Sequence, residues 1–461
     1  PDDLQKFIKL HADMVQNPSY KEEQLAKEKG PVTSEIQMLC DNPGNMAINT
    51  TLKNLFQIRT KSRDLIGGTV ENIEGMTRQT VVDYYKNWYT PDNMTTVIVG
   101  EVDPHSTASL INRYFGSNIS SRADKSYSEP LVPIQNTVRT DISNPNTESV
   151  LLNMGFSGPA NDSPKEVIAT EALCAALTGY KNAQLNKALK PFGVEASIGT
   201  EIISPNLRDP LAILLEANFQ PGTEEEGLKT IYSTIYEMTY RPVDESEMTI
   251  IKNKLKESLK YSAESAMSIS SFIGHSILDH GDIRNYAASV QLIDSLTPYD
   301  IMQSAQKFLN LNKTVITMLH PASQAVSNSV KAPNAVSFCG KKPDTSNSKE
   351  YTLPNHLIVY TIVVNHSPIV SAQLSFRVQN PLHMKPGIAS ILSRMLSYGT
   401  AMNSEESMEN LKDTNNIACD VSVSSDEVLV NADFSKESAG LAYGIMKENL
   451  LYPNFTQENF E

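Results

Sequence analysis

Two glutamates, Glu28 and Glu35, are the residues whose type and spacing first suggest metal chemistry. They lie seven positions apart in residues 28–38, which read EKGPVTSEIQM. On an α-helix this spacing places both carboxylates on one face, two turns apart. Glutamates paired in this way are also typical of a solvated helix face, so the pair by itself does not establish a site.

Other routes to catalysis find less support in the sequence. None of the eight histidines forms an HxxEH, HExxH or HxH motif. His275 and His280 are separated by about 140° around a predicted helix, so they cannot share a metal on one face. No GxSxG elbow, P-loop or strand-linked GxGxxG occurs. Without any CxxC pair, we predict lone, mostly buried thiols for the four cysteines, Cys40, Cys174, Cys339 and Cys419.

The chain has 461 residues, a length that suits roughly two to four domains. Its net charge of −14 disfavours nucleic acid and anionic lipid but is compatible with a neutral or basic peptide. No run of apolar residues is long enough for a membrane span, so we expect a soluble protein. Both ends read as mid-domain sequence. We therefore expect an internal piece of a longer polypeptide, which leaves the compartment open.

The elements around the glutamate pair are predicted to be helical. Apolar periodicity indicates helices over residues 1–40 with a break at 17–19, and Pro31 either kinks the second helix or restarts it. Thr77 is a predicted N-cap for a helix over residues 77–89. A buried strand at 94–100 and a helix from Asp103 to Phe115 complete this α+β region.

The same α+β plan recurs along the chain, as antiparallel strand pairs that carry helices on one face. Polar residues 116–136 form the first boundary, and residues 323–349 are the best linker candidate. Between them the predicted order is strands 137–142 and 148–156, helix 164–179, strands 194–203 and 210–219, helices 222–239, 244–282 and 298–309, and strand 314–319. Beyond the linker it is strands 358–364 and 369–377, helices 386–397 and 404–412, strands 416–422 and 427–433, and helix 436–451.

Residues 28–38 resemble the second half of the zinc-binding signature of the pitrilysin/insulinase family of inverzincin metallopeptidases. In that family an HxxEH helix supplies two histidine ligands and a general-base glutamate. Several dozen residues later, an E-x6-E helix supplies the third ligand from its second glutamate. The resemblance implies that Glu35 binds zinc and that Glu28 is a supporting carboxylate of the catalytic site.

A second block strengthens the resemblance, because its helix, turn and strand are similar to the family's in order and spacing. It comprises residues 67–73 (GGTVENI), 84–94 (YYKNWYTPDNM) and 97–103 (VIVGEVD). This agreement over a long stretch is more specific than the glutamate pair.

A third block, residues 386–400, reads PGIASILSRMLSYGT and resembles the family's G-x-A-H-x-x-E-H-M-L-x-x-G-T helix. Ser390, Ser393 and Arg394 stand where histidine, glutamate and histidine would be. None of these three can replace a neutral imidazole or a general-base carboxylate on zinc. The resemblance therefore implies a degenerate, inactive copy of the motif.

The resemblance covers nearly the whole chain and implies a clamshell of repeated α+β domains. Residues 1–125 correspond to the C-terminal part of the metal-binding peptidase domain and residues 137–322 to a second, non-catalytic homologous domain. Residues 323–349 are the linker, and residues 350–461 correspond to the N-terminal part of a third, degenerate peptidase-like domain. This order suits family members that fuse an active half to an inactive half.

The implied function is a zinc-dependent metalloendopeptidase that hydrolyses peptides or small unfolded proteins in an enclosed chamber. Its implied cofactor is Zn²⁺, and its partners are peptide substrates and the other half of the same polypeptide beyond residue 461. Because the HxxEH helix is absent, we expect this chain to be inactive alone. Two alternatives remain open: a non-catalytic structural or peptide-binding member of the family, and an unrelated peptide-binding or chaperone-like protein without zinc.

Overall fold

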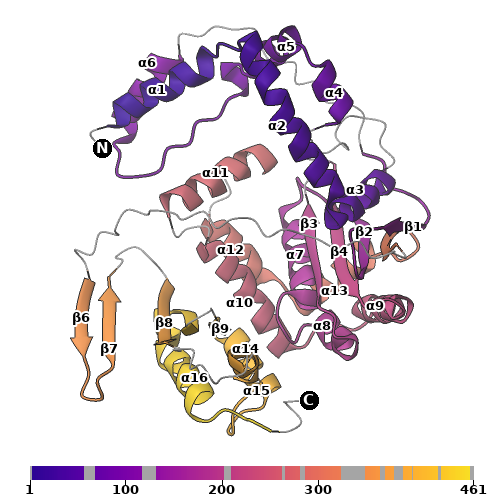
Figure 1. The fold of residues 1–461 in the computed structure, drawn as a ribbon, viewed down its shortest axis with the longest axis vertical. Coiled ribbons are helices and arrows are strands. Elements are labelled where there is room, and N and C mark those ends of the chain that lie inside the picture. Colours follow the sequence, from indigo (N-terminus) through magenta and orange to yellow (C-terminus); the bar gives the residue numbers. More distant parts are fainter. Residues whose placement is uncertain are drawn as a thin grey trace.

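The arrangement has three parts, which we call the first, second and third units (residues 3–116, 131–322 and 348–456). Figure 1 shows an arc of helices, then a sheet with its helices, then a smaller sheet at the far end of the molecule. A computed structural model describes residues 3–56, 68–116, 131–201, 209–261, 265–280, 286–322, 348–363, 369–377, 388–396, 398–423 and 427–456. Most of the predicted linker, residues 323–347, lies outside the described residues, as do Cys339, His366 and His383.

The first unit consists of helices in its described part. Residues Ile8, Ala12 and Phe115 pack α1 against α6 in a small apolar cluster. Thr77 and Asp103 cap α5 and α6 through their side-chain oxygens, which confirms both predicted helix starts. The elements are α1 (Leu4–Gln16), α2 (Glu22–Asp41), α3 (Pro43–Leu55), α4 (Val70–Gly75), α5 (Arg78–Trp88), the 3₁₀ turn η2 (Pro91–Asn93) and α6 (Pro104–Phe115).

The strand predicted at residues 94–100 does not form in the described structure. A β-branched run becomes a strand only when a neighbouring strand accepts and donates its backbone hydrogen bonds. The described residues place no such neighbour beside this segment. The prediction of a strand at residues 94–100 was therefore wrong, because no neighbouring strand pairs with this segment in the described structure.

The second unit is built on a five-stranded sheet of order β1-β5-β2-β4-β3. Its pairings are antiparallel except for β1 with β5, which is parallel, and the sheet with its helices confirms the predicted α+β class. The strands are β1 (Val138–Asn144), β2 (Val150–Ala160), β3 (Ala196–Glu201), β4 (Pro210–Phe219) and β5 (Val315–Pro321).

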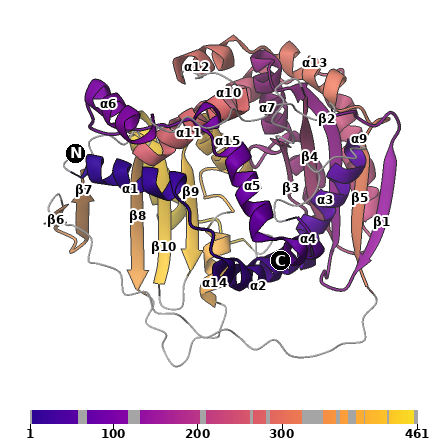
Figure 2. The ribbon, with the colours of Figure 1, turned by 90° about the horizontal axis from the view of Figure 1, so that it is seen from above.

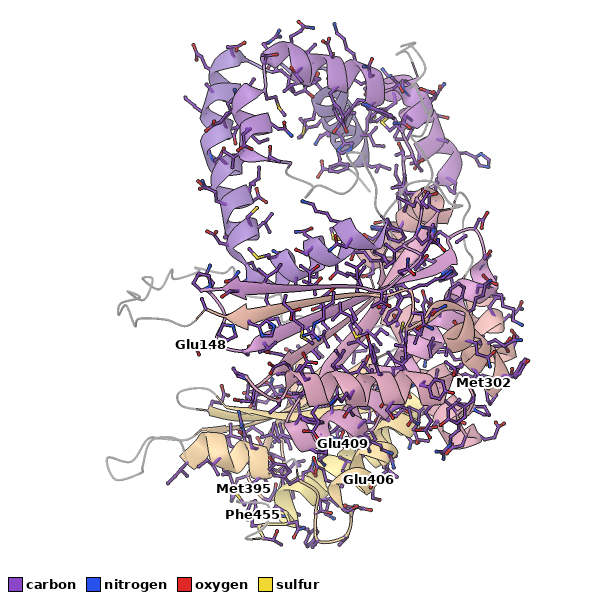
Figure 3. The ribbon with its side chains drawn as sticks, turned by 90° about the vertical axis from the view of Figure 1, so that its right-hand side faces the viewer. Glu148, Met302, Met395, Glu406, Glu409 and Phe455 are labelled. Atoms are coloured by element: carbon purple, nitrogen blue, oxygen red, sulfur yellow. The ribbon has the colours of Figure 1, made fainter. Side chains whose placement is uncertain are left out.

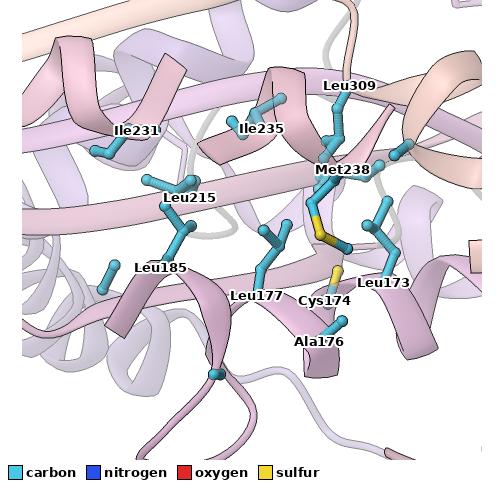
Figure 4. Packing of buried hydrophobic residues seen from close by; sticks show 14 of the residues in the cluster. Leu173, Cys174, Ala176, Leu177, Leu185, Leu215, Ile231, Ile235, Met238 and Leu309 are labelled. Carbon is cyan, nitrogen blue, oxygen red and sulfur yellow. The ribbon is translucent and has the colours of Figure 1, made fainter. Parts of the chain in front are cut away.

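Helices cover one face of this sheet and enclose the main core. Leu152, Met154 and Phe156 alternate along β2 toward these helices, and all three are at most 2% exposed. Figure 4 shows this packing around Leu173, Leu177 and other apolar side chains. The helix predicted at 244–282 is two helices, α10 and α11. The helical elements are α7 (Pro164–Thr178), α8 (Gln184–Leu189), η3 (Lys190–Phe192), α9 (Glu224–Met238), α10 (Glu245–Tyr261), α11 (Ala266–His280), α12 (Tyr286–Ser295) and α13 (Pro298–Phe308).

The opposite face of the sheet carries α3, which comes from the first unit (Figures 1 and 2). Leu55 and Phe56 at the end of α3 are buried with Leu214 of β4 and Val315 of β5. A helix of one unit thus closes part of the sheet of the next.

The third unit holds a separate apolar core and two small sheets. One sheet is a hairpin, and the other has the order β8-β10-β9. The elements are β6 (Ser348–Thr352), β7 (Ile358–Ile362), β8 (Ile369–Arg377), α14 (Ile388–Met395), α15 (Glu405–Thr414), β9 (Ala418–Val423), β10 (Glu427–Ser435), η4 (Lys436–Ser438) and α16 (Ala439–Leu451).

A helix that crosses a lipid bilayer must be long and predominantly apolar. Within the described ranges, none is both long and apolar enough.

Candidate functional site

Helix α2 carries both glutamates on one continuous helix. It runs from Glu22 to Asp41 and contains Pro31, so the helix continues through the proline and does not restart there. Pro31 has no N–H, which deprives the Lys27 carbonyl of its usual partner one turn on. Since the helix is unbroken, the seven-residue spacing does place Glu28 and Glu35 on one face.

The carboxylates of Glu28 and Glu35 are both exposed. A catalytic zinc site takes three protein ligands and leaves one position for water or substrate. In the part of the chain that the structure describes, no group of three His, Cys, Asp or Glu side chains could hold a metal ion. The described residues therefore do not by themselves fit zinc, and the roles of Glu28 and Glu35 stay predictions.

Contacts within α2 and just before it fix this helix in the first unit. The Lys29 Nζ donates to the Glu74 backbone oxygen of α4 at 2.8 Å, and Ile36 is buried with only 2% exposure. Just before α2, the Arg78 Nε donates to the Tyr20 carbonyl at 2.6 Å. These contacts set the direction in which the glutamate face of α2 points.

The YYKNWYTPDNM block forms the end of α5 and the turn that follows. Tyr85 donates its hydroxyl hydrogen to the Val15 carbonyl at 2.8 Å, which ties α5 to the end of α1. Thr90 is buried and donates to Asp92 at 2.6 Å, while Asn93 Nδ2 donates to the Trp88 carbonyl at 2.9 Å. The block therefore positions the framework beside α2.

Helix α14 contains the degenerate motif. Arg394 is exposed and Ser393 is buried, whereas the side chain of Ser390 lies outside the described residues. Gly399 has a φ of +88°, and a Cβ there would lie 2.6 Å from the Glu405 backbone nitrogen, so only glycine suits this turn. The turn after α14 therefore requires glycine, as in the motif that the segment resembles, whereas Ser393 and Arg394 differ from that motif.

Arg394 lines a cavity of about 580 Å³ at the junction of the second and third units. The junction is held by ion pairs, with Lys181 Nζ 2.8 Å from Glu405 Oε1 and Lys190 Nζ 3.5 Å from Glu405 Oε2. Burial acts to raise the pKa of Glu405, but Lys181 and Lys190 outweigh it and the pKa is lowered. Figure 3 shows Glu406 and Glu409 on the side of α15 that faces the second unit.

Sequence reasoning missed one polar feature inside the second unit. Asn153 lies in the middle of β2, among the apolar residues VLLNMGF, and is buried. A lone asparagine in an otherwise apolar strand is the signal that could have drawn attention to it, because a buried carboxamide needs hydrogen-bond partners.

Comparisons with known proteins agree on one family. The model of the family described as "Peptidase M16 inactive domain" matches residues 75–255. An uncharacterized zinc protease of Mycobacterium leprae is 25% identical over 310 residues, covering 67% of this chain and 69% of the relative.

Solved structures share the fold at low identity. A protease from Helicobacter pylori has a TM-score of 0.61 at 17% identity and covers 69% of this chain and 78% of its own. The periplasmic protease PqqL from Escherichia coli has a TM-score of 0.57 at 12% identity over 99% of this chain, which spans 56% of PqqL. The family model, the named relative and the shared fold agree with the sequence blocks, and all of them confirm the resemblance to the M16 peptidases, the pitrilysin/insulinase family.

Proposed function

We propose that the protein is a zinc-dependent metalloendopeptidase that hydrolyses peptides or small unfolded proteins in an enclosed chamber, with Glu35 as a zinc ligand and Glu28 as a supporting carboxylate. The observation that carries the proposal is the pair of exposed carboxylates on one face of the unbroken helix α2. The match of residues 75–255 to a peptidase family model and a relative named as a zinc protease support it.

Glu35 would be one of three protein ligands. The two histidines of an HxxEH motif would have to come from outside the described residues, since these contain no HxxEH and no three-ligand group. In this proposal the chain orients the Glu35 carboxylate through the contacts that fix α2.

We also propose the division into residues 1–125, 137–322, 323–349 and 350–461, as parts of a peptidase domain, a second domain, a linker and a degenerate domain. Strands β1 to β5 lie within the second range. Strand β6 begins at Ser348, inside the last two residues assigned to the linker. In the proposed protein, the second and degenerate domains enclose the substrate.

The direct test is to read the coding sequence that precedes residue 1. An HxxEH motif followed by several dozen residues before Glu35 supports the zinc peptidase. A degenerate motif there contradicts it. Expression of the extended protein would then allow Glu35→Gln to be compared with Glu226→Gln, an exposed glutamate on α9. Zinc content and peptide turnover should be lost in the first and kept in the second.

A second candidate is a non-catalytic member that binds peptides or serves as a structural subunit. The sequence of α14 supports it, because Ser393 and Arg394 stand where the motif that this segment resembles has glutamate and histidine. The same sequence test separates the two candidates. The match of residues 75–255 to the M16 model and the shared fold weigh against the remaining alternative of an unrelated protein.

A further inference from the structure

A row of polar side chains crosses the face of the five-stranded sheet that α3 partly covers. Each strand contributes one residue to this row, and neighbours in the row are register partners. The row runs across β1, β5, β2, β4 and β3 in the order Thr140, Thr317, Asn153, Glu216 and Ser197. Because side chains alternate between the faces of a strand, all five lie opposite the main core.

Helix α3 provides partners for one end of the row. Thr51 Oγ1 donates to Thr317 Oγ1 at 2.8 Å, deep in the buried layer between helix and sheet. Asn54 Nδ2 donates to Thr140 Oγ1 at 3.3 Å. The other end of the row, from β2 to β3, lies beneath the start of α3 instead.

A pocket of about 340 Å³ remains at that other end, and we call it the Asn153 pocket. Its floor is formed by β2, β4 and β3, and Gly44 and Ala47 of α3 line its upper side. Asn153 is 1% exposed, and among the described residues neither its Oδ1 nor its Nδ2 has a hydrogen-bond partner. A buried carboxamide without partners is unfavourable, so one that lines a cavity points to a group that binds there.

The charge around the pocket identifies the sign of that group. Glu195 and Glu216 line the pocket, and Glu201 lies on the same face of β3. None of these three carboxylates has an ion-pair or hydrogen-bond partner within the described ranges. Burial raises the pKa of Glu201, and the nearby charge of Glu216 raises it further, so these two carboxylates form a negative patch on this face.

We propose that the Asn153 pocket binds the ammonium group of a lysine side chain in a peptide. The three N–H donors of an ammonium match the acceptors that Asn153 Oδ1 and the carboxylates of Glu216 and Glu195 present. The Nδ2 of Asn153 is left to donate to a carbonyl of the same peptide. The inference rests on the proposed function only in that peptides are taken as the ligands.

The shape of the pocket favours a lysine side chain over other cations. Its apolar lining includes Ala47 and Leu151, which suits the methylene stem of lysine with the charge at its end. A metal ion fits poorly, because no three-ligand group of His, Cys, Asp or Glu occurs among the described residues.

The test is a binding measurement on the full chain by isothermal titration calorimetry, with EDTA present. The probe is a short alanine peptide, capped at both ends, with a single lysine; its counterpart carries norleucine, which has the stem without the charge. We expect the lysine peptide to bind at least about tenfold more tightly. Equal affinities would overturn the proposal, as would tighter binding of an uncapped norleucine peptide, which would assign the site to an amino terminus.

Two variants locate the binding. Asn153→Leu and Glu216→Gln should each remove the preference for lysine, whereas Glu226→Gln, which removes an exposed charge on the helix side of the sheet, should keep it. Asn153→Leu should not lower the melting temperature, since it removes a buried polar group that lacks partners. If it fails to fold, the exposed Glu216 carries the test, and retention of the preference in Glu216→Gln overturns the proposal.

The outcome of the lysine-peptide binding measurement does not depend on zinc binding or on peptide hydrolysis. A chain that binds lysine peptides but proves to have no HxxEH partner segment loses the peptidase proposal and keeps the pocket. A chain that lacks the lysine preference while the extended protein hydrolyses peptides loses the pocket and keeps the peptidase.

Discussion

Thr51 of α3 packs directly on Gly155 of β2. A Cβ at Gly155 would lie 2.5 Å from Thr51 Cγ2 and 3.4 Å from Leu55 Cδ2, closer than real side chains approach in the first case. The absence of a side chain on β2 is therefore what lets a helix of the first unit lie against the sheet of the second.

Gly155→Ala should lower the free energy of unfolding by about 1–3 kcal/mol, the usual effect of overpacking a close contact. The measurement is urea unfolding followed by circular dichroism. Gly199→Ala is the matched control, since a Cβ at Gly199 on β3 would meet nothing within 4 Å. Equal effects of the two substitutions would contradict the steric explanation.

Glu405→Gln should loosen the junction between the second and third units. The substitution removes the charge that pairs with Lys181 and Lys190. We expect faster hydrogen exchange in α15 and at least about twofold more rapid proteolysis between the units, with the difference shrinking at high salt because these charges are partly exposed. An unchanged exchange rate in α15 would count against the ion pairs as the connection.

The same junction should depend on pH in a defined direction. Because the pKa of Glu405 is lowered from its ordinary value of 4.5 in the folded protein, its contribution is present above pH 4.5 and is lost as the pH falls through the lower folded value. The protection of the α15 amides, taken relative to the unfolded chain at the same pH, should therefore stay high at mildly acidic pH. It should fall only at lower pH. If the protection of α15 were already lost at neutral pH, another group would control the junction.

Asp413→Asn should stabilise the protein at neutral pH. Burial raises the pKa of Asp413 although Lys254 lies 3.3 Å away, so the ionised form is disfavoured in the folded state. For a carboxyl whose folded pKa is raised, stability falls as the pH rises from the unfolded value through the folded one. We expect a gain of about 1 kcal/mol in urea unfolding. Asp420→Asn, at an exposed carboxylate, should give no gain.

Cys40 and Cys174 should react very differently with thiol reagents. Burial raises the pKa of Cys174 to about 12, and its side chain lies in the main core, whereas Cys40 is exposed. Iodoacetamide followed by peptide mass spectrometry should label Cys40 in the folded protein and Cys174 only after unfolding. Labelling of Cys174 at the rate of Cys40 would show that the core opens readily.

Local chemistry explains which elements could be predicted from the sequence. Thr77 and Asp103 each satisfy backbone N–H groups of the helix they precede, so those helix starts followed from the residues alone. The end of α2 is also the start of α3, because Asn42 Oδ1 accepts from Asn45 N at 3.1 Å and caps α3. The same residues that end one helix cap another, so α3 was missed.

Features that depend on residues far apart in the chain could not be predicted from the sequence. The run at 94–100 has strand-forming residues but no neighbouring strand in the described structure. The position of Glu28 and Glu35 on one face followed from helix geometry. Their proposed role at a metal also requires ligands from outside α2, which helix geometry cannot predict. The Asn153 pocket depends on the register of β2, β4 and β3, which no local pattern specifies.

The main core of the second unit and the core of the third share no apolar cluster across their junction in the described residues. Separation of these units would therefore expose little apolar surface to water. Heat capacity changes in proportion to such surface, so opening the junction should have a small heat-capacity change. The balance between docked and undocked forms would then respond strongly to ionic strength, and its enthalpy would vary little with temperature.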